Sequence, residues 1–257
     1  MRPGSATSRA ARQIERRLDD LRGVRASPPD DVSSLPEPAQ RYLSHALGES
    51  PGTAPGVRLT MHGSVLQGER RLPLSAREVL VPPHGFVWRA RAHLGPVVVS
   101  VRDFYLERES RVDVHLLGVV AMGGEHGPDT AASSRGRLAG ESVWVPSMLA
   151  PRRGVWWTEL DDERADVHLL IDGVEESLTL RVDSEGRLAE LRMHRWGDVG
   201  VEQHQPVPYG FAVTAERRFD GYTIPSELEG GWWYGTERYD PERASRFTIE
   251  SAEYIDP

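Results

Sequence analysis

The sequence contains no cysteine and no lysine, and all 31 of its basic residues are arginine. Without cysteine, the chain forms no disulfide, no thiolate metal site and no cysteine nucleophile. Without lysine, it forms no lysine Schiff base and lacks the lysine of a phosphate-binding loop. These two absences exclude several classes of enzyme before any motif is considered.

The sequence also lacks a net positive charge and a long apolar run. The 257 residues carry a net charge of -8, whereas general binding to nucleic acid needs a basic surface. No apolar run is long enough to span a bilayer, and the charged N-terminal segment lacks the apolar core of a secretory signal. We therefore expect no nucleic-acid partner, no transmembrane segment and a cytoplasmic location.

Motifs for metals and cofactors are missing as well. The histidines at positions such as His62, His93 and His168 stand singly on expected strands, without an HxH or HExxH pattern. The glycine-rich segment 123–129 is not followed by the Gly-Lys pair of a phosphate-binding loop. We expect neither a metal ion nor a cofactor.

The first 34 residues are predicted to form an arm helix and a linker. Ile14, Leu18 and Leu21 recur at helical spacing within residues 8–23, and mostly charged residues separate them. So narrow an apolar stripe favours a frayed, solvated helix; the alternatives are contact with an anionic membrane surface or with a partner protein. A Pro- and Ser-rich linker follows, so we expect a single β-rich domain over residues 35–257, beginning with a short helix.

From residue 57 onward the apolar period changes to two. Val57, Leu59 and Met61 share one face of an expected strand. A sheet of about ten or more such strands does not stay flat, and it curls or splits. We predict a mainly β fold, a large curled antiparallel sheet that forms an open barrel or half-barrel. Further strands are expected at segments 86–94, 111–118, 164–171, 176–183, 187–196, 211–219, 231–239 and 245–254.

A helical segment at about residues 130–150 interrupts the strands. Because strands precede and follow it, its expected place is across the apolar concavity of the curled sheet. Pro146 removes the hydrogen bond that its amide would donate to Ser142, so the helix is expected to kink or restart near Val145.

Several segments occur in an order that resembles a known family. They are LPEPAQRYLSHAL, GFVWRARAHLGP, GRLAGESVWVPSML, RWGD and GYTIPSELEGGWWYGTERY. From about residue 35 to the end, the chain resembles an uncharacterised bacterial family known only as a domain of unknown function. The expected helix-covered sheet is also similar to the lipoprotein-carrier half-barrels of the bacterial envelope, which hold acyl chains.

Glu141 falls among Leu138, Val145 and Leu149 on the apolar face of the expected covering helix. A carboxylate there is costly unless it is paired or protonated. One interpretation is an ion pair with a sheet arginine, Arg89 or Arg195, that pins the helix. The other is a general acid or base, or an anchor for a polar group of a ligand.

The segment HRWGD offers a second candidate for acid–base chemistry. His194 could act as a base that Asp198 orients. No GxSxG nucleophile accompanies the pair, so a hydrolase triad is unsupported, and an ordinary strand end is the favoured interpretation.

Seven tryptophans are the remaining signal. Since adjacent residues of a strand face opposite ways, we expect Trp232 and Tyr234 on one face and Trp233 on the other. These aromatics either fill the core or line a pocket for an apolar ligand. The predicted pocket wall consists of Trp88, Trp144, Trp196, Trp232 and Tyr234, with Glu141 and Arg195 as its polar groups.

The function predicted from these features is non-catalytic binding of a lipid or other hydrophobic small molecule between helix and sheet. One alternative is an enzyme that uses Glu141, or His194 with Asp198, on a small hydrophobic substrate. Another is an interaction module that docks a partner, or contacts a membrane surface, through residues 8–23.

Overall fold

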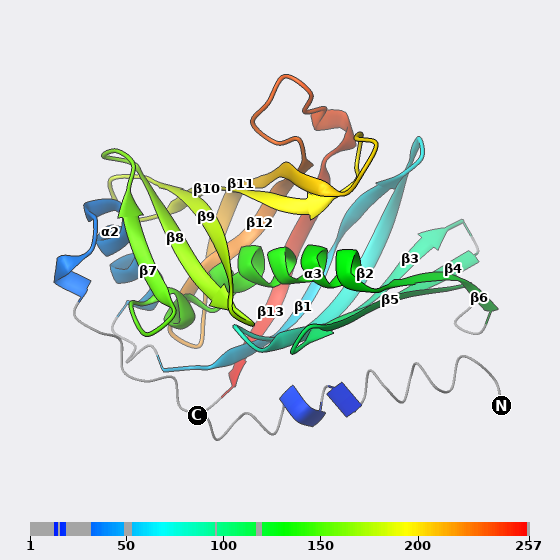
Figure 1. Ribbon diagram of the computed structural model, residues 1–257, viewed down its shortest axis with the longest axis horizontal. Helices are drawn as coiled ribbons and strands as arrows, with labels where there is room; N and C mark the ends of the chain where they lie inside the picture. Colours follow the sequence, from blue (N-terminus) through cyan, green and yellow to red (C-terminus); the bar gives the residue numbers. More distant parts are fainter. Residues whose placement is uncertain are drawn as a thin grey trace.

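One continuous antiparallel sheet dominates the computed structural model, which describes residues 13–14, 16–18, 32–48, 53–95, 97–116 and 120–255. Its 13 strands follow the order β6-β5-β4-β3-β2-β1-β13-β12-β11-β10-β9-β8-β7, and the sheet curls strongly (Figure 1). The predicted mainly β class and curled open sheet are confirmed. The strands are β1 (Gly56–Gln67), β2 (Arg70–Val81), β3 (Gly85–Leu94), β4 (Val97–Leu106), β5 (Glu109–Leu116), β6 (Val120–His126), β7 (Val155–Glu159), β8 (Arg164–Ile171), β9 (Val174–Val182), β10 (Leu188–Gly197), β11 (Gln205–Phe219), β12 (Tyr222–Trp232) and β13 (Ser245–Ile255).

The strand order explains why a helix crosses the sheet. The first and last strands, β1 and β13, pair at its centre. The chain meanders outward from β1 to one edge at β6, and it resumes at β7 on the opposite edge. The connection between the two edges must therefore cross one face, and α3 (Pro128–Glu141) runs across the concave one (Figure 1).

The covering segment is a helix followed by two short 3-10 turns. After α3 come η3 (Ser142–Trp144) and η4 (Pro146–Leu149), and Val145 between them leaves the helical conformation with φ -127° and ψ 66°. This break confirms the predicted restart next to Pro146, where the ring cannot continue the helical hydrogen bonds. The break turns Trp144 and Leu149 into the core on either side of it.

The main core lies between the concave face of the sheet and its helices. The helix α2 (Glu37–Leu47) closes one end of it through Tyr42 and Leu43, which are both almost fully buried. Two further 3-10 turns are η2 (Val32–Ser34) and η5 (Pro241–Arg243). No described helix is both long enough and apolar enough to cross a bilayer.

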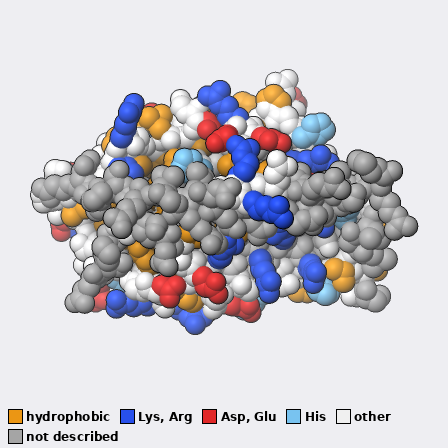
Figure 2. Space-filling view, turned by 90° about the horizontal axis from the view of Figure 1, so that it is seen from below, with side chains coloured by type: hydrophobic (Ala, Val, Ile, Leu, Met, Phe, Trp, Pro, Cys, Tyr) orange, Lys and Arg blue, Asp and Glu red, His pale blue; other side chains and the backbone are white. Residues whose placement is uncertain are grey.

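A smaller apolar cluster occupies the opposite, convex face. Residues 13–14 and 16–18 are helical and lie below the sheet in Figure 1, where Ile14 and Leu18 are buried against Val79, Phe104 and Ile255, among others. The expectation of a solvated helix is therefore wrong at these two positions. The convex face of the sheet carries an apolar patch against which they pack, and the sequence pattern did not reveal this patch. Figure 2 views this side, where basic, acidic and apolar side chains are interspersed. The other residues of the predicted arm helix and linker, 8–12, 15 and 19–31, lie outside the described residues.

Candidate ligand cavity beneath the covering helix

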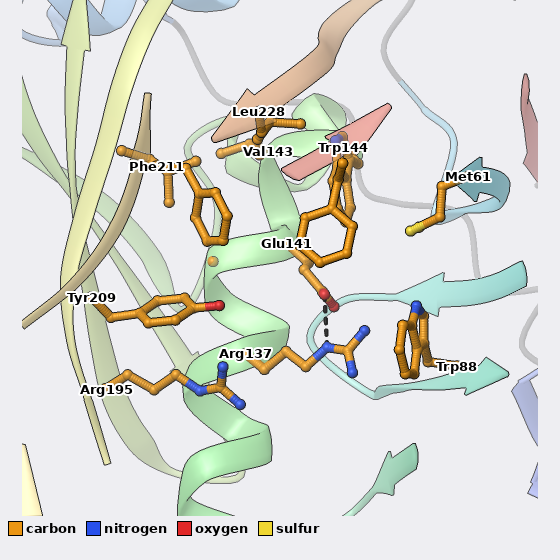
Figure 3. Close-up of a pocket in the computed structure, with 13 residues that line it drawn as sticks. Met61, Trp88, Arg137, Glu141, Val143, Trp144, Arg195, Tyr209, Phe211 and Leu228 are labelled. Atoms are coloured by element: carbon orange, nitrogen blue, oxygen red, sulfur yellow. Dashed lines mark hydrogen bonds and ion pairs between the residues drawn. The ribbon is translucent and has the colours of Figure 1, made fainter. Parts of the chain in front are cut away.

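A cavity of about 170 Å³ lies between the end of the covering helix and the concave face of the sheet (Figure 3). Strands β1, β3 and β10 to β13 contribute its wall, and α3 and η3 contribute its roof. Trp88, Tyr209 and Phe247 are only half-buried, so the cavity is not sealed from solvent. The lining residues are Met61, Trp88, Arg137, Gly140, Glu141, Val143, Trp144, Leu191, Arg195, Tyr209, Phe211, Leu228 and Phe247.

Two glycines on one face of α3 allow the helix to approach the sheet closely. A Cβ at Gly136 would stand 3.2 Å from Cγ of Arg195 and 3.4 Å from Cε of Met193. A Cβ at Gly140, one turn later, would meet only the Met193 sulfur at 3.5 Å. Gly136 therefore sets the contact with β10, whereas Gly140 faces the cavity and leaves space that a side chain could fill.

Trp144 closes the cavity on the side of η3. Its indole Nε1 donates a hydrogen bond to the carbonyl oxygen of Pro225 at 3.1 Å, and only 6% of the residue is exposed. A buried indole N–H needs such an acceptor, so this bond fixes the ring position. Tyr254 also donates its hydroxyl proton to the carbonyl oxygen of Trp144 at 2.9 Å, which ties the same turn to β13.

A single guanidinium, that of Arg137, joins three carboxylates at one end of the cavity. Its Nε donates to Glu141 at 2.7 Å, its Nη1 to Asp103 at 2.8 Å and its Nη2 to Glu78 at 3.1 Å. The guanidinium also lies 4.6 Å from the ring centre of Phe86 and 4.9 Å from that of Trp88. We call Arg137, Glu78, Asp103 and Glu141 the acid cluster.

The acid cluster holds more negative charge than its arginine can neutralise. Burial and the nearby charge of Glu141 raise the pKa of Glu78 well above its usual value, despite the opposing effect of Arg137. Oε2 of Glu78, Oε2 of Glu141 and Oδ1 of Asp103 are buried without a donor while all three groups are ionised. A proton on Glu78 resolves part of this deficit, because it can donate a hydrogen bond to Glu141. Glu78 therefore keeps its proton at a pH at which an exposed glutamate is ionised.

Arg195 enters the cavity from β10 and is bonded differently. Its Nε donates to the carbonyl oxygen of Ser133 in α3 at 3.1 Å, and its guanidinium lies 5.0 Å from the ring centre of Tyr209 and 5.3 Å from that of Trp232. Among the described residues, no carboxylate lies within ion-pair distance of Arg195; Glu176, which acts on it only electrostatically, is bonded to Arg135 at 2.6 Å. Its terminal nitrogens accordingly remain available as donors.

Four of the seven predicted pocket residues line the cavity. These are Trp88, Glu141, Trp144 and Arg195. Glu141 pairs with Arg137 of its own helix rather than with Arg89 or Arg195, so the predicted partner was wrong.

The other three predicted residues lie outside the cavity lining. Trp196 donates its indole proton to Asp129 at 2.8 Å, at the start of α3. Trp232 packs edge-on against Tyr209, behind the wall. Tyr234 donates its hydroxyl proton to Glu190 at 3.1 Å and leaves the strand altogether.

The predicted strand over residues 231–239 is wrong beyond residue 232, because the observed strand β12 lies earlier in the sequence. Strand β12 stops at Trp232, and Trp233 adopts a left-handed φ of 66°. The expectation that Trp232 and Tyr234 share a strand face is therefore wrong. The turn is held by Trp233, whose Nε1 donates to the carbonyl oxygen of Val199 at 3.0 Å and whose ring lies 3.4 Å from the guanidinium carbon of Arg238.

His194 and Asp198 are both exposed and do not bond to each other within the described part of the chain. Asp198 instead faces His204, at 3.9 Å between Oδ2 and Nε2. The predicted base and its orienting partner are thus not brought together, because the strand ends between them. Within the same described ranges, no three His, Asp or Glu side chains are placed to hold a metal ion.

Sequence reasoning missed Arg137, Glu78, Asp103 and Tyr209. The signal for two of them was present: Glu78 interrupts an apolar alternation in β2, and Asp103 does the same in β4. The strand register brings the two carboxylates to the same level of the sheet, since Glu78 pairs with Trp88 and Trp88 pairs with Asp103 across three adjacent strands.

Three solved structures are similar to this chain at low identity. One is a domain of Vibrio parahaemolyticus assigned as an outer membrane lipoprotein-sorting protein, with 8% identity over 85% of this chain and 91% of that chain and a TM-score of 0.44. Another is a LolA superfamily protein from Nitrosomonas europaea, with 7% identity over 84% of this chain and 91% of that chain and a TM-score of 0.44. The third is a DUF1329 family protein from Desulfovibrio piger, with 12% identity over 85% of this chain and 94% of that chain and a TM-score of 0.37.

No curated protein sequence matches the chain significantly. A family model does match, over residues 25–241, which is most of the chain. Its description is a family of unknown function, DUF6544. The protein with the helix-covered sheet described above belongs to the DUF6544 family.

Proposed function

We propose that this protein binds one small hydrophobic molecule, or the end of a single acyl chain, in the cavity beneath α3, and that it does so without catalysis. The observation that carries this proposal is the unfilled space of about 170 Å³ inside an otherwise packed core. Most of the side chains that line this space are apolar. A hydrophobic ligand that enters it buries apolar surface against them, which is favourable by about 25 cal/mol per Å².

The size of the cavity limits the ligand. Pockets for drug-sized molecules usually measure roughly 300–1,000 Å³, whereas a dry cavity of about 150 Å³ accepts benzene. At about 170 Å³, this cavity suits one ring or a chain of about six to eight carbons. A diacyl lipid would have to leave most of its apolar surface outside.

The lining supports an apolar ligand with one polar end. Phe211 and Leu228 lie at one part of the space, and Arg137, Glu141 and Arg195 stand at the other (Figure 3). Such a combination of an apolar wall with a few convergent polar groups is typical of small-molecule sites.

Titration with 1-octanol tests the proposal directly. Trp88 and Trp144 line the cavity, so occupancy is expected to change the intrinsic fluorescence. We expect saturable binding with a Kd of roughly 1 µM to 1 mM, because the translational and rotational entropy lost on association offsets much of the free energy gained from burying a small ligand. Native mass spectrometry of protein purified without detergent complements the titration, because a co-purifying ligand would add a discrete mass.

A matched pair of variants at Gly140 ties the binding to this cavity. Gly140→Leu is expected to fill the space and abolish octanol binding, while the fold keeps or gains stability because glycine is a poor helix former. Gly140→Ala adds only a Cβ at an ordinary contact distance and is expected to retain binding. Absence of any saturable signal in the wild type, together with a ligand-free mass, would count against the proposal.

No specific observation on the described residues favours the enzyme or the interaction module over ligand binding. Glu141 is bonded to Arg137 through Oε1 while its Oε2 is buried from solvent, and His194 and Asp198 stand apart, so neither predicted acid–base group is placed to act on a ligand. For the predicted arm, Ile14 and Leu18 face the sheet rather than a membrane or a partner. Both alternatives stay predictions.

A further inference from the structure

We infer that the ligand of this cavity carries a carboxylate, and that Arg195 with the Tyr209 hydroxyl recognises it. The inference rests on the proposed function and names its ligand class: a single-chain monocarboxylate, with the carboxylate at the arginine end and the chain toward Phe211 and Leu228.

The polar groups of the cavity differ in whether they can still form hydrogen bonds. Arg137 is already held by three carboxylates, one bonded to each of its nitrogens, so its charge is more than matched within the acid cluster. Arg195 uses only Nε, for Ser133, and its terminal nitrogens are not among the buried atoms of the described residues that lack partners. Since they have neither a bonded partner nor full burial, a ligand that enters the cavity can reach them.

The Tyr209 hydroxyl is in the same situation. Within the described residues it has no hydrogen-bond partner, and it is not fully buried. Tyr209 and Arg195 stand on neighbouring strands, β11 and β10, and the ring of Tyr209 lies 5.0 Å from the guanidinium carbon. Figure 3 shows the hydroxyl and the guanidinium pointing from the same wall toward the interior of the cavity.

The acid cluster is the competing site, since its surplus charge would favour an amine. Its partnerless oxygens, Oε2 of Glu78, Oε2 of Glu141 and Oδ1 of Asp103, are however buried from solvent. A ligand ammonium could not reach them without a rearrangement of the side chains that bury them. Accessible donors and inaccessible acceptors therefore favour an anion over a cation.

The number of donors favours a carboxylate over a phosphate. A guanidinium matches the two oxygens of a carboxylate in its plane, and a hydroxyl adds one further bond. A phosphate monoester brings three oxygens and up to two charges, for which one arginine and one tyrosine supply too few donors. The negative charge of the nearby Glu141 also repels a doubly charged phosphate more strongly than a singly charged carboxylate.

The test compares four eight-carbon ligands on the full-length protein: octanoate, 1-octanol, octylamine and octyl phosphate. We expect octanoate to bind at least about tenfold more tightly than the other three, as charge-assisted hydrogen bonds are the strong ones. Arg195→Gln is expected to remove this preference and to change octanol affinity by less than about threefold. Arg192→Gln is the matched control, because Arg192 lies on the same strand but faces Tyr234 outside the cavity.

Tyr209→Phe provides a second variant should Arg195→Gln fold poorly. It removes only the hydroxyl and is expected to weaken octanoate severalfold without weakening octanol. Equal binding of octanol and octanoate by the wild type would overturn the carboxylate inference and leave the proposed function standing. Tightest binding of octylamine or octyl phosphate would also overturn it, as would an octanoate preference that survives in Arg195→Gln. If none of the four ligands binds, both the inference and the proposed function fail.

Discussion

Replacement of Arg137 by methionine is expected to destabilise the protein severely. Methionine fills much of the aliphatic volume of arginine but removes the cation that three carboxylates share at 2.7, 2.8 and 3.1 Å. Removal of one partner from a buried ion pair costs about 3–5 kcal/mol. Since domains are stable by about 5–15 kcal/mol, the loss would be a large fraction of the total.

The pH dependence of the loss distinguishes this mechanism from poor packing. Without Arg137, the loss of its positive charge would raise the pKa of Glu78 in the folded state further, so the folded state would bind more protons than the unfolded state. Stability then falls as pH rises above the unfolded carboxyl pKa of about 4.3. We therefore expect a larger loss at pH 7.5 than at pH 5.

Urea unfolding followed by tryptophan fluorescence measures both quantities. Arg246→Met serves as the control, because its pair with Glu229 is exposed, and its unfolding midpoint is expected to match that of the wild type at both pH values. If Arg137→Met does not fold at pH 7.5, adding Glu78→Gln reduces the unpaired charge and is expected to restore part of the stability. A loss below about 1 kcal/mol, or a loss larger at pH 5 than at pH 7.5, would refute the reasoning.

Three further predictions concern single side chains. Glu78→Gln keeps an acceptor for Arg137 and a donor for Glu141. Because the pKa of Glu78 is raised, the wild type loses stability as the pH rises above about 4.5, so the stability of the variant relative to the wild type should increase by up to about 1.4 kcal/mol per pH unit. A difference in stability to urea that does not change with pH would contradict this. Trp144→Ala should cost about 3–5 kcal/mol and admit larger ligands, whereas Trp144→Phe keeps most of the ring packing and should lose about 1 kcal/mol with the bond to Pro225; a Trp144→Phe variant as stable as the wild type in thermal unfolding would argue against that bond. Leu18→Ala should cost about 2–5 kcal/mol in urea, and a neutral result would mean that the residue does not contribute to cooperative unfolding.

The sheet was predictable because its pattern is local. Strand β1 follows from the alternation of Val57, Leu59 and Met61, and the crossing helix follows from its position between two strand blocks. The strand order was not predictable, since pairing of β1 with β13 joins residues almost 200 positions apart.

The site was only half predictable for a related reason. Glu141 stands out because it falls on an apolar helical face, but Arg137, four residues earlier, has the spacing of an ordinary exposed helix pair. Only the tertiary contacts with Glu78 and Asp103 make it the centre of a buried cluster. The turn at Trp233 was missed because a left-handed φ at tryptophan is unusual, and Gly231 and Gly235 pointed only to a local irregularity.

The same contacts that place α3 also create the cavity. On one side, Gly136 brings the helix close to β10, and on the other Arg137 binds carboxylates of β2 and β4. Strands β1 and β11 to β13 lie between these two attachments. Because the helix is held on both sides of them, it cannot move closer to their side chains, and the space between helix and sheet stays open. The cavity is thus a consequence of how the crossing segment is anchored, and loss of Arg137 should relax its shape as well as lower stability. A ligand that fills the space stabilises the folded state by mass action, and it should therefore stabilise the wild type more than Arg137→Met at equal concentration.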